Sequence, residues 1–136
     1  AGVKAVLTGD GNVEEKLRQC FGGELPNIVF DATGNKASME LAFHYAAHGG
    51  TLVYVGLVQD DLTFHDPLFH ARELTLLASR NATREDFEFV MKALADGSVD
   101  AGAFVTHRVP FERAPDEFKS WLNPANHVIK AMAVLD

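Results

Sequence analysis

A glycine turn between an apolar run and a helix start is the first place where this sequence could do chemistry. Asn27 to Ala32 form the apolar run, and Thr33-Gly34-Asn35 follow with turn and cap residues. A glycine there lets a ligand approach the backbone, and the free N–H groups of a helix N-terminus favour a polar or anionic ligand. Any α/β protein needs such turns, so a purely structural role is also compatible with this one turn.

A second glycine stands in a similar position further along the chain. Val55-Gly56-Leu57 follow the apolar run that begins at Thr51. In open parallel sheets, ligands bind outside the carboxyl ends of the strands. The two glycine turns together therefore predict a binding site at that edge of a sheet. The sequence contains neither a phosphate-binding P-loop nor a Gly-x-Gly-x-x-Gly turn.

The histidines offer a possible metal site, but a weak one. His44 and His48 are four residues apart, which would place both rings on one face of a helix. No cysteine or carboxylate pair is placed to complete the ligand set, so solvated surface histidines are favoured. His65 and His70 flank a proline in an expected loop, and His107 is expected in a core or an interface. We expect neither a metal site nor a catalytic residue in this chain.

A single cysteine, Cys20, limits the chemistry further. It falls on the apolar side of a predicted helix, where a small hydrophobic residue is expected. One cysteine allows no internal disulfide and no thiolate-rich metal site. There is also no Gly-x-Ser-x-Gly elbow for nucleophilic catalysis. A reducing, cytoplasmic setting is the resulting expectation.

The composition is that of a soluble globular protein. The chain has 136 residues, of which 47% are hydrophobic and 23% charged, a length that fits one domain better than two. The net charge of −7 and the absence of a basic stripe argue against nucleic-acid binding. The longest apolar run, Gly49 to Val58, is too short to span a membrane.

Short apolar runs alternate with amphipathic stretches, which is typical of parallel α/β units. The two glycine turns follow continuous apolar runs, so we expect both faces of those strands to be covered by helices. The stretch from Gln59 to Arg72 is expected to be irregular, with Pro67 breaking any long element. Strands are predicted at Lys4–Thr8, Ile28–Ala32, Thr51–Gly56, Leu74–Ala78, Phe104–Val109 and Val128–Leu135.

Helices are predicted from caps and apolar periodicity. Asn12 with Glu15, and Thr83 with Asp86, have the spacing of helix-capping pairs. A further short helix is expected over Arg113–Leu122. The apolar stripes expected to be buried are Val13, Leu17, Cys20 and Phe21; then Met39, Ala42, Phe43 and Ala46; then Phe87, Val90, Met91 and Leu94.

Four segments along the chain are informative as a set. They are Val29-Phe30-Asp31-Ala32-Thr33-Gly34, Gly49-Gly50-Thr51-Leu52-Val53-Tyr54-Val55-Gly56, Leu74-Thr75-Leu76-Leu77-Ala78-Ser79 and Val105-Thr106-His107-Arg108-Val109-Pro110-Phe111-Glu112. Any one segment is a weak signal, but together they resemble the C-terminal part of the medium-chain dehydrogenase/reductase family, in the family's order and at similar spacing. The resemblance is strongest to the zinc-type sorbitol, threonine and sugar-acid dehydrogenases.

The resemblance implies an α/β fold with a partial Rossmann-type parallel sheet. Residues 1–100 would form the second half of a nucleotide-binding domain, and residues 101–136 would return to complete the catalytic domain. The cofactor would be NAD or NADP, with NAD favoured. The family's Gly-x-Gly-x-x-Gly turn, its zinc ligands and its proton relay would precede residue 1, so zinc would belong to the full-length enzyme and not to this chain. The strand at Lys4–Thr8 would then lack its neighbours.

The resemblance also assigns cofactor-binding residues along the length of the nucleotide. They are Ala32, Thr33 and Gly34 on the adenosine–ribose side; Val55, Gly56 and Leu57 at the nicotinamide end; Ser79, Arg80 and Asn81 around the carboxamide; and Lys130 at the pyrophosphate.

The implied function is hydride transfer from a secondary alcohol, such as a polyol or sugar acid, to NAD(P), with zinc assisting in the full-length enzyme. The isolated chain is expected to be inactive, and to form a homodimer through the strand Leu74–Ser79. A zinc-free quinone or enoyl reductase of the same superfamily is an alternative, although the run from Thr106 to Phe111 favours the zinc type. A non-catalytic α/β binding module is a further alternative. Asp31 and Lys130 do not fit the acidic and lysine positions of a receiver-like signalling domain.

Overall fold

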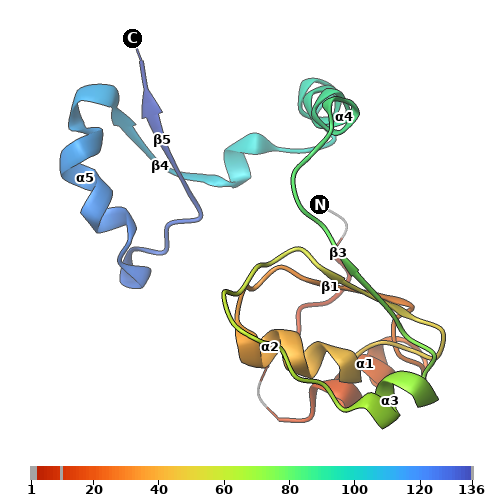
Figure 1. The fold of residues 1–136 in the computed structure, drawn as a ribbon. Helices are drawn as coiled ribbons and strands as arrows, with labels where there is room; N and C mark the ends of the chain where they lie inside the picture. The colour runs from red at the N-terminus through yellow and green to blue at the C-terminus, as the bar shows by residue number, and fades with distance from the viewer. Residues whose placement is uncertain (1–2, 10, 136) are drawn as a thin grey trace. The chain divides into compact units, whose positions relative to one another are not determined.

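The chain folds into two compact units that meet in sequence at Asn81 and Ala82. The structure is a computed structural model that describes residues 3–9 and 11–135. Figure 1 shows the elements of both units in chain order. No helix of the described residues is both long and apolar enough to cross a membrane.

The N-terminal unit contains a parallel sheet whose strands are neighbours in the order β1-β2-β3. The strands are β1 (Ile28–Asp31), β2 (Thr51–Tyr54) and β3 (Thr75–Ala78). Helix α2 (Lys36–Leu41) and the 3₁₀ helix η1 (Ala42–His44) connect β1 to β2, and α3 (Asp66–Ala71) connects β2 to β3. Helix α1 (Val13–Cys20) precedes them. The parallel strands and helical crossovers predicted from the sequence are therefore present.

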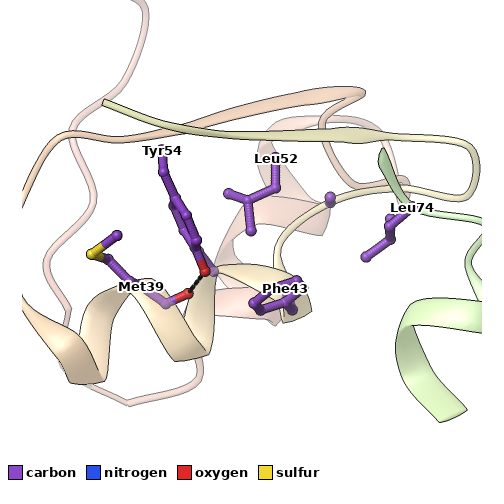
Figure 2. Packing of buried hydrophobic residues seen from close by; sticks show 7 residues of the cluster. Met39, Phe43, Leu52, Tyr54 and Leu74 are labelled. Atoms are coloured by element: carbon purple, nitrogen blue, oxygen red, sulfur yellow. Dashed lines mark hydrogen bonds between the residues drawn. The ribbon is translucent and has the colours of Figure 1, made fainter. Parts of the chain in front are cut away.

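One face of this sheet carries the core. Both crossovers run in the same direction along the sheet, and right-handed crossovers then place their helices on the same face; Figure 1 shows α1, α2 and α3 on that side. The second predicted apolar stripe is buried there, although its α-helix ends at Leu41 and continues as a 3₁₀ turn. The buried cluster, drawn in Figure 2, is Met39, Ala42, Phe43, Ala46, Leu52, Tyr54 and Leu74.

The opposite face of the sheet is open, which corrects the expectation that helices would cover both faces. Ile28 is 57% exposed and Phe30 is 67% exposed, and Leu77 on β3 is 52% exposed. Phe30 and Leu77 flank Val53 in the parallel register, so these side chains share one face. A continuous apolar run predicts a strand that can be buried on both sides, but it does not supply the covering helix.

The first 25 residues depart most from the prediction. Lys4–Thr8 form no strand and are exposed. A strand needs a neighbour to satisfy its backbone groups, and none of the described strands pairs with this segment. Helix α1 does form, with the Asn12 side chain accepting the Glu15 N–H at 3.2 Å. Its apolar stripe is not buried, however: Cys20 is exposed, and so is Phe21.

The expectation of an irregular segment from Gln59 to Arg72 is wrong over its second half, because α3 forms there. Pro67 lies in the first turn of that helix. In this position the fixed φ of proline suits a helix and its missing N–H would have no partner anyway. Pro67 therefore begins a helix instead of breaking one.

The C-terminal unit contains a second, smaller parallel pair of strands, β4 (Val105–Pro110) and β5 (Lys130–Val134), with an irregularity between Val105 and His107. The crossover between them contains α5 (Ala114–Trp121), which has its proline in the first turn as predicted. Short 3₁₀ turns complete the unit: η2 (Ala101–Ala103), η3 (Phe111–Arg113) and η4 (Pro124–Asn126).

Helix α4 (Arg84–Ala95) begins as predicted, with a capping box between Thr83 and Asp86. Its apolar stripe is exposed, contrary to expectation. Phe87 is 63% exposed and Met91 is 67% exposed, and Val90 and Leu94 are exposed as well. Periodicity determines which side of a helix is apolar, but not whether another element covers that side.

Candidate functional site

The two glycine turns meet at the carboxyl ends of β1 and β2. A Cβ added to Gly56 would collide with the backbone nitrogen of Gly34, so the two backbones cross where only glycine fits. Gly34 itself has a φ of +59°, and a Cβ on it would lie 3.2 Å from the carbonyl oxygen of Leu57. The main-chain carbonyl of Asp31 accepts the N–H groups of Val55 at 2.8 Å and Gly56 at 2.9 Å. The two turns that the sequence singled out are thus in contact with each other.

Next to this crossing lies a pocket of about 480 Å³ at the carboxyl ends of β2 and β3. Its walls are mainly apolar, with polar groups concentrated after β3. The lining residues are Met39, Tyr54, Val55, Gly56, Leu57, Val58, Leu62, Ala78, Ser79, Arg80 and Asn81.

The pocket gathers most of the residues that the sequence singled out. Those assigned to the nicotinamide end and to the carboxamide all line it. Ala32, Thr33 and Gly34 do not line it, but they adjoin it through the crossing with Gly56. Lys130 lies on β5 of the other unit and is exposed.

Tyr54 forms part of the pocket wall and was missed by the sequence analysis. Its hydroxyl donates a 2.6 Å hydrogen bond to the main-chain carbonyl of Met39 (Figure 2). Burial, together with the nearby charges of Asp31 and Glu40, raises the pKa of Tyr54 to about 12. The ring packs edge-on against Phe43, with the centroids 6.2 Å apart. The only sequence signal was its place at the end of a strand, just before the predicted site.

Asp31 is the buried polar residue beside the pocket, with only 5% of its surface exposed. One carboxylate oxygen accepts the N–H of Thr33 at 2.9 Å and its hydroxyl at 2.7 Å. The other accepts the Ser38 hydroxyl at 2.7 Å. Burial raises the pKa of the Asp31 carboxyl, but these hydrogen bonds outweigh burial and hold the pKa below its usual value. A carboxylate at the end of an apolar run was the signal that could have identified it.

The loop that follows Gly56 is tied to α2 by two polar contacts. The Lys36 ammonium lies 2.9 Å from the Asp60 carboxylate. The Glu40 carboxylate accepts the N–H of Thr63 at 2.9 Å and its hydroxyl at 3.0 Å. These contacts fix the loop that carries the wall residues Leu57, Val58 and Leu62.

The chain turns sharply where it leaves β3. The N–H of Ser79 donates to the Tyr54 carbonyl at 2.8 Å, which continues the strand pairing to the pocket. Asn81 then takes a left-handed conformation with a φ of 65°. Asparagine tolerates this conformation better than other side chains that carry a Cβ. The turn brings Ser79, Arg80 and Asn81 into the wall together.

The histidines do not assemble a site. His44 ends the 3₁₀ turn η1 and His48 lies beyond it, so the two do not share a helix face, and both are exposed. His107 is half-buried on β4, with Nδ1 2.9 Å from the Thr106 hydroxyl. Residues 3–9 and 11–135 contain no group of three or more histidine, cysteine or acidic side chains that could hold a metal ion.

Comparison with known proteins places the chain in a family. The model of the zinc-binding dehydrogenase family matches residues 1–96. The chain belongs to this family. The predicted membership of the medium-chain dehydrogenases of the zinc type is thereby confirmed.

The relatives of this chain include a sugar-acid dehydrogenase and a polyol dehydrogenase. The chain is 43% identical over 106 residues to the L-galactonate-5-dehydrogenase of Escherichia coli strain K12, covering 78% of this chain and 31% of that protein. It is 33% identical over 98 residues to the sorbitol dehydrogenase of Macaca fascicularis, covering 71% and 27%. The chain thus spans about a third of the length of the curated relatives it matches.

Solved structures confirm the fold. The alcohol dehydrogenase TADH of Thermus sp. ATN1 superposes with a TM-score of 0.78 at 24% identity, over 93% of this chain and 36% of that one. A zinc-binding dehydrogenase of Sinorhizobium meliloti bound to NADP gives a TM-score of 0.71 at 21% identity, over 79% and 31%. The sheet β1-β2-β3 is part of a Rossmann-type parallel sheet, as predicted.

Proposed function

We propose that this chain forms the nicotinamide side of the cofactor site in a zinc-assisted dehydrogenase that transfers hydride from a secondary alcohol to NAD(P). The observation that carries the proposal is the single pocket in which Val55, Gly56 and Leu57 meet Ser79, Arg80 and Asn81. These are the residues that the family resemblance assigns to the nicotinamide ring and its carboxamide. The substrate would be a polyol or sugar acid, since relatives at 43% and 33% identity carry such names.

The pocket has the properties that a nicotinamide needs. Its volume of about 480 Å³ and its apolar walls suit a flat ring. The polar residues after β3 offer hydrogen-bonding groups for a carboxamide. A Cβ at Gly56 would collide with the backbone of Gly34, so glycine is needed there to keep the two turns in contact beside the pocket. Bound NAD(P) would supply the hydride acceptor, and these residues would bind and orient it.

The choice between NAD and NADP and the presence of zinc are further parts of this proposal. Solved structures of similar fold carry NADH in an Escherichia coli alcohol dehydrogenase and NADP in the Sinorhizobium enzyme. We favour NAD, as the resemblance implies. The described residues contain no ligand set for zinc, so the zinc of the family would have to be bound by residues beyond those described here.

The N-terminal and C-terminal parts of the chain would have different roles. We propose that residues 1–100 belong to the cofactor-binding domain and residues 101–136 to the catalytic domain. Lys130 would contact the cofactor pyrophosphate; its exposed position on β5 supports this role. The protein would act in the cytoplasm.

We also propose that this dehydrogenase chain forms a homodimer through β3. Among the described strands, β3 pairs with β2 on one side only. Its backbone groups on the other side are available to a second copy, and a twofold axis there gives a closed contact.

Titration of the isotopically labelled chain with NADH and NADPH, followed by amide chemical shifts, tests the cofactor proposal. Shifts should concentrate at residues 55–57 and 79–81. The affinity should be weaker than micromolar, because part of a groove should not supply about −8 kcal/mol. Adenosine monophosphate, which lacks the nicotinamide, is the control ligand and should not shift residues 79–81. No change at these residues at millimolar cofactor would refute the proposal.

A further inference from the structure

We propose that Asp31 is a positioning residue of the cofactor pocket: it holds the Thr33–Gly34 turn against the Gly56–Leu57 turn so that the groove is formed before the cofactor arrives. The inference rests on the proposed function of the pocket. Asp31 does not line the pocket and is not expected to touch the cofactor. It acts through the two turns.

The side chain of Asp31 anchors the first turn and the start of the helix behind it. The carboxylate accepts both the N–H and the hydroxyl of Thr33, which fixes the residue next to Gly34. It also accepts the hydroxyl of Ser38, which lies in the first turn of α2. One buried group thereby joins the strand end, the glycine turn and the helix.

The main chain of Asp31 anchors the second turn. Its carbonyl accepts the N–H groups of Val55 and Gly56, at 2.8 and 2.9 Å. Both turns are thus bonded to one residue, from its side chain and from its backbone. The backbones of Gly34 and Gly56 are in close contact, so a movement of one turn toward the other must displace it.

A carboxylate suits this position for a chemical reason. All three side-chain partners of Asp31 are donors, and an ionised carboxylate only accepts hydrogen bonds. An asparagine would present an NH₂ group to one set of these donors and would lose the extra strength of charged hydrogen bonds. The lowered pKa of Asp31 agrees with an ionised group in this environment.

The chain contains a matched control in Asp86. Its carboxylate also accepts the N–H and hydroxyl of a threonine, Thr83, at 2.8 and 3.0 Å. Asp86 is exposed and lies in the other unit. Asp31→Asn and Asp86→Asn therefore make the same chemical change at a carboxylate that accepts from a threonine N–H and hydroxyl. Asp31 ends a strand beside the pocket, whereas Asp86 belongs to the capping box of α4.

The test compares NADH affinity and amide hydrogen exchange in the wild-type chain and these variants. Asp31→Asn should weaken NADH binding about tenfold, the cost of replacing charged by neutral hydrogen bonds. Exchange of the Thr33 amide should accelerate, and so should that of Gly56, whose own acceptor is unchanged. Asp86→Asn should leave NADH affinity and both amides as in the wild type. If Asp31→Asn does not fold, Ser38→Ala replaces it and should weaken binding in the same direction.

The outcomes separate this inference from the proposed function. If the wild type binds NADH and Asp31→Asn binds it equally well, the positioning role is wrong. If Thr33 exchange accelerates while Gly56 exchange and affinity do not change, Asp31 serves its own turn only, and the inference is also wrong. If the wild type gives no response to NADH, the proposed function fails. The exchange of Thr33 and Gly56 then decides whether Asp31 holds the two turns.

Discussion

The hydroxyl of Tyr54 donates its 2.6 Å hydrogen bond to the carbonyl of Met39 directly beside the pocket that both residues line. The bond joins the end of β2 to α2, the helix that covers the sheet. The same residue therefore contributes to the core and to the pocket wall. Changes in the ionisation or packing of Tyr54 should therefore affect both the core and the pocket.

Tyr54 should titrate well above the pH range of an ordinary phenol. Its raised pKa means that the folded chain favours the neutral phenol, so this stabilisation is present below about pH 10 and is lost as the pH rises through about 12. Tyr54→Phe should remove the tyrosinate absorbance step near pH 12 and lower the free energy of unfolding at neutral pH by about 1 kcal/mol. Tyr45→Phe, the control, should leave that step in place. A Tyr54 step at an ordinary pH would contradict its burial.

Gly56→Ala should disrupt the crossing of the two turns. The new Cβ would collide with the backbone of Gly34, which cannot move aside as a side chain could. We expect a loss of about 1–3 kcal/mol in the free energy of unfolding, together with loss of the NADH-dependent shifts at the pocket. Gly9→Ala is the control, because its Cβ would meet nothing within 4 Å. Equal denaturant midpoints for the two variants would show that the crossing is looser than the structure indicates.

Arg72 should matter more to stability than an exposed arginine. Its guanidinium donates to the carbonyls of His44 at 2.8 Å and Ala46 at 3.1 Å, and lies 3.2 Å from Glu14. Its side chain is only 13% exposed. Arg72→Met should cost about 2–3 kcal/mol, because the carbonyls of His44 and Ala46 both lose a charged donor.

The control for Arg72 is Arg84, whose ion pair with Glu88 is on the surface, with the arginine side chain 87% exposed. Arg84→Met should change the free energy of unfolding by no more than about 0.5 kcal/mol. Urea denaturation of both variants measures the difference. Similar losses would mean that Arg72 is not an anchor between α1 and the end of η1.

Lys130→Ala, made in the proposed full-length enzyme, tests the proposed pyrophosphate contact. The dissociation constant of the cofactor should rise about tenfold or more, because a charge-assisted hydrogen bond to a phosphate is lost. The KM of the alcohol should change little. Lys119→Ala on α5 is the control. An effect on the alcohol alone would place Lys130 in a different site.

The proposed dimer depends on the outer edge of β3. Thr75 and Ser79 donate their N–H groups toward β2, to Gly50 and Tyr54. The alternation of a strand then directs the N–H of Leu76 away from β2. Leu76→Pro should therefore remove an intermolecular donor while leaving the pairing with β2 intact.

Sedimentation at micromolar concentration should show a dimer for the wild type and for Leu76→Ala, which keeps the N–H, and a monomer for Leu76→Pro. A dimer that survives Leu76→Pro would indicate another interface. A wild-type monomer would remove the dimer proposal altogether.

Local chemistry in the sequence was sufficient to predict most elements of the fold. The cap residues Asn12 and Thr83 predicted the starts of α1 and α4, because a side-chain oxygen satisfies a backbone N–H only a few residues away. The stripe from Met39 to Ala46 predicted a buried helical face for the same local reason. The turns at Gly34 and Gly56 could also be predicted, because a left-handed or crowded backbone restricts a position to glycine.

By itself, the sequence determined the parallel strands from β1 to β5 and the helices α1, α2, α4 and α5, but not α3. It also determined the dehydrogenase resemblance and the edge of the sheet at which we propose the ligand site. The tertiary structure decided which apolar surfaces are covered: the face carrying Leu52 is buried, whereas the face carrying Phe30 is exposed, although both residues occupy apolar runs. It also placed Tyr54 and Asp31 beside the pocket, where each forms a hydrogen bond with a residue of α2 that is distant from it in the sequence. Burial and pocket geometry depend on which segments pack together in space, and residue periodicity along one segment carries no information about its partners.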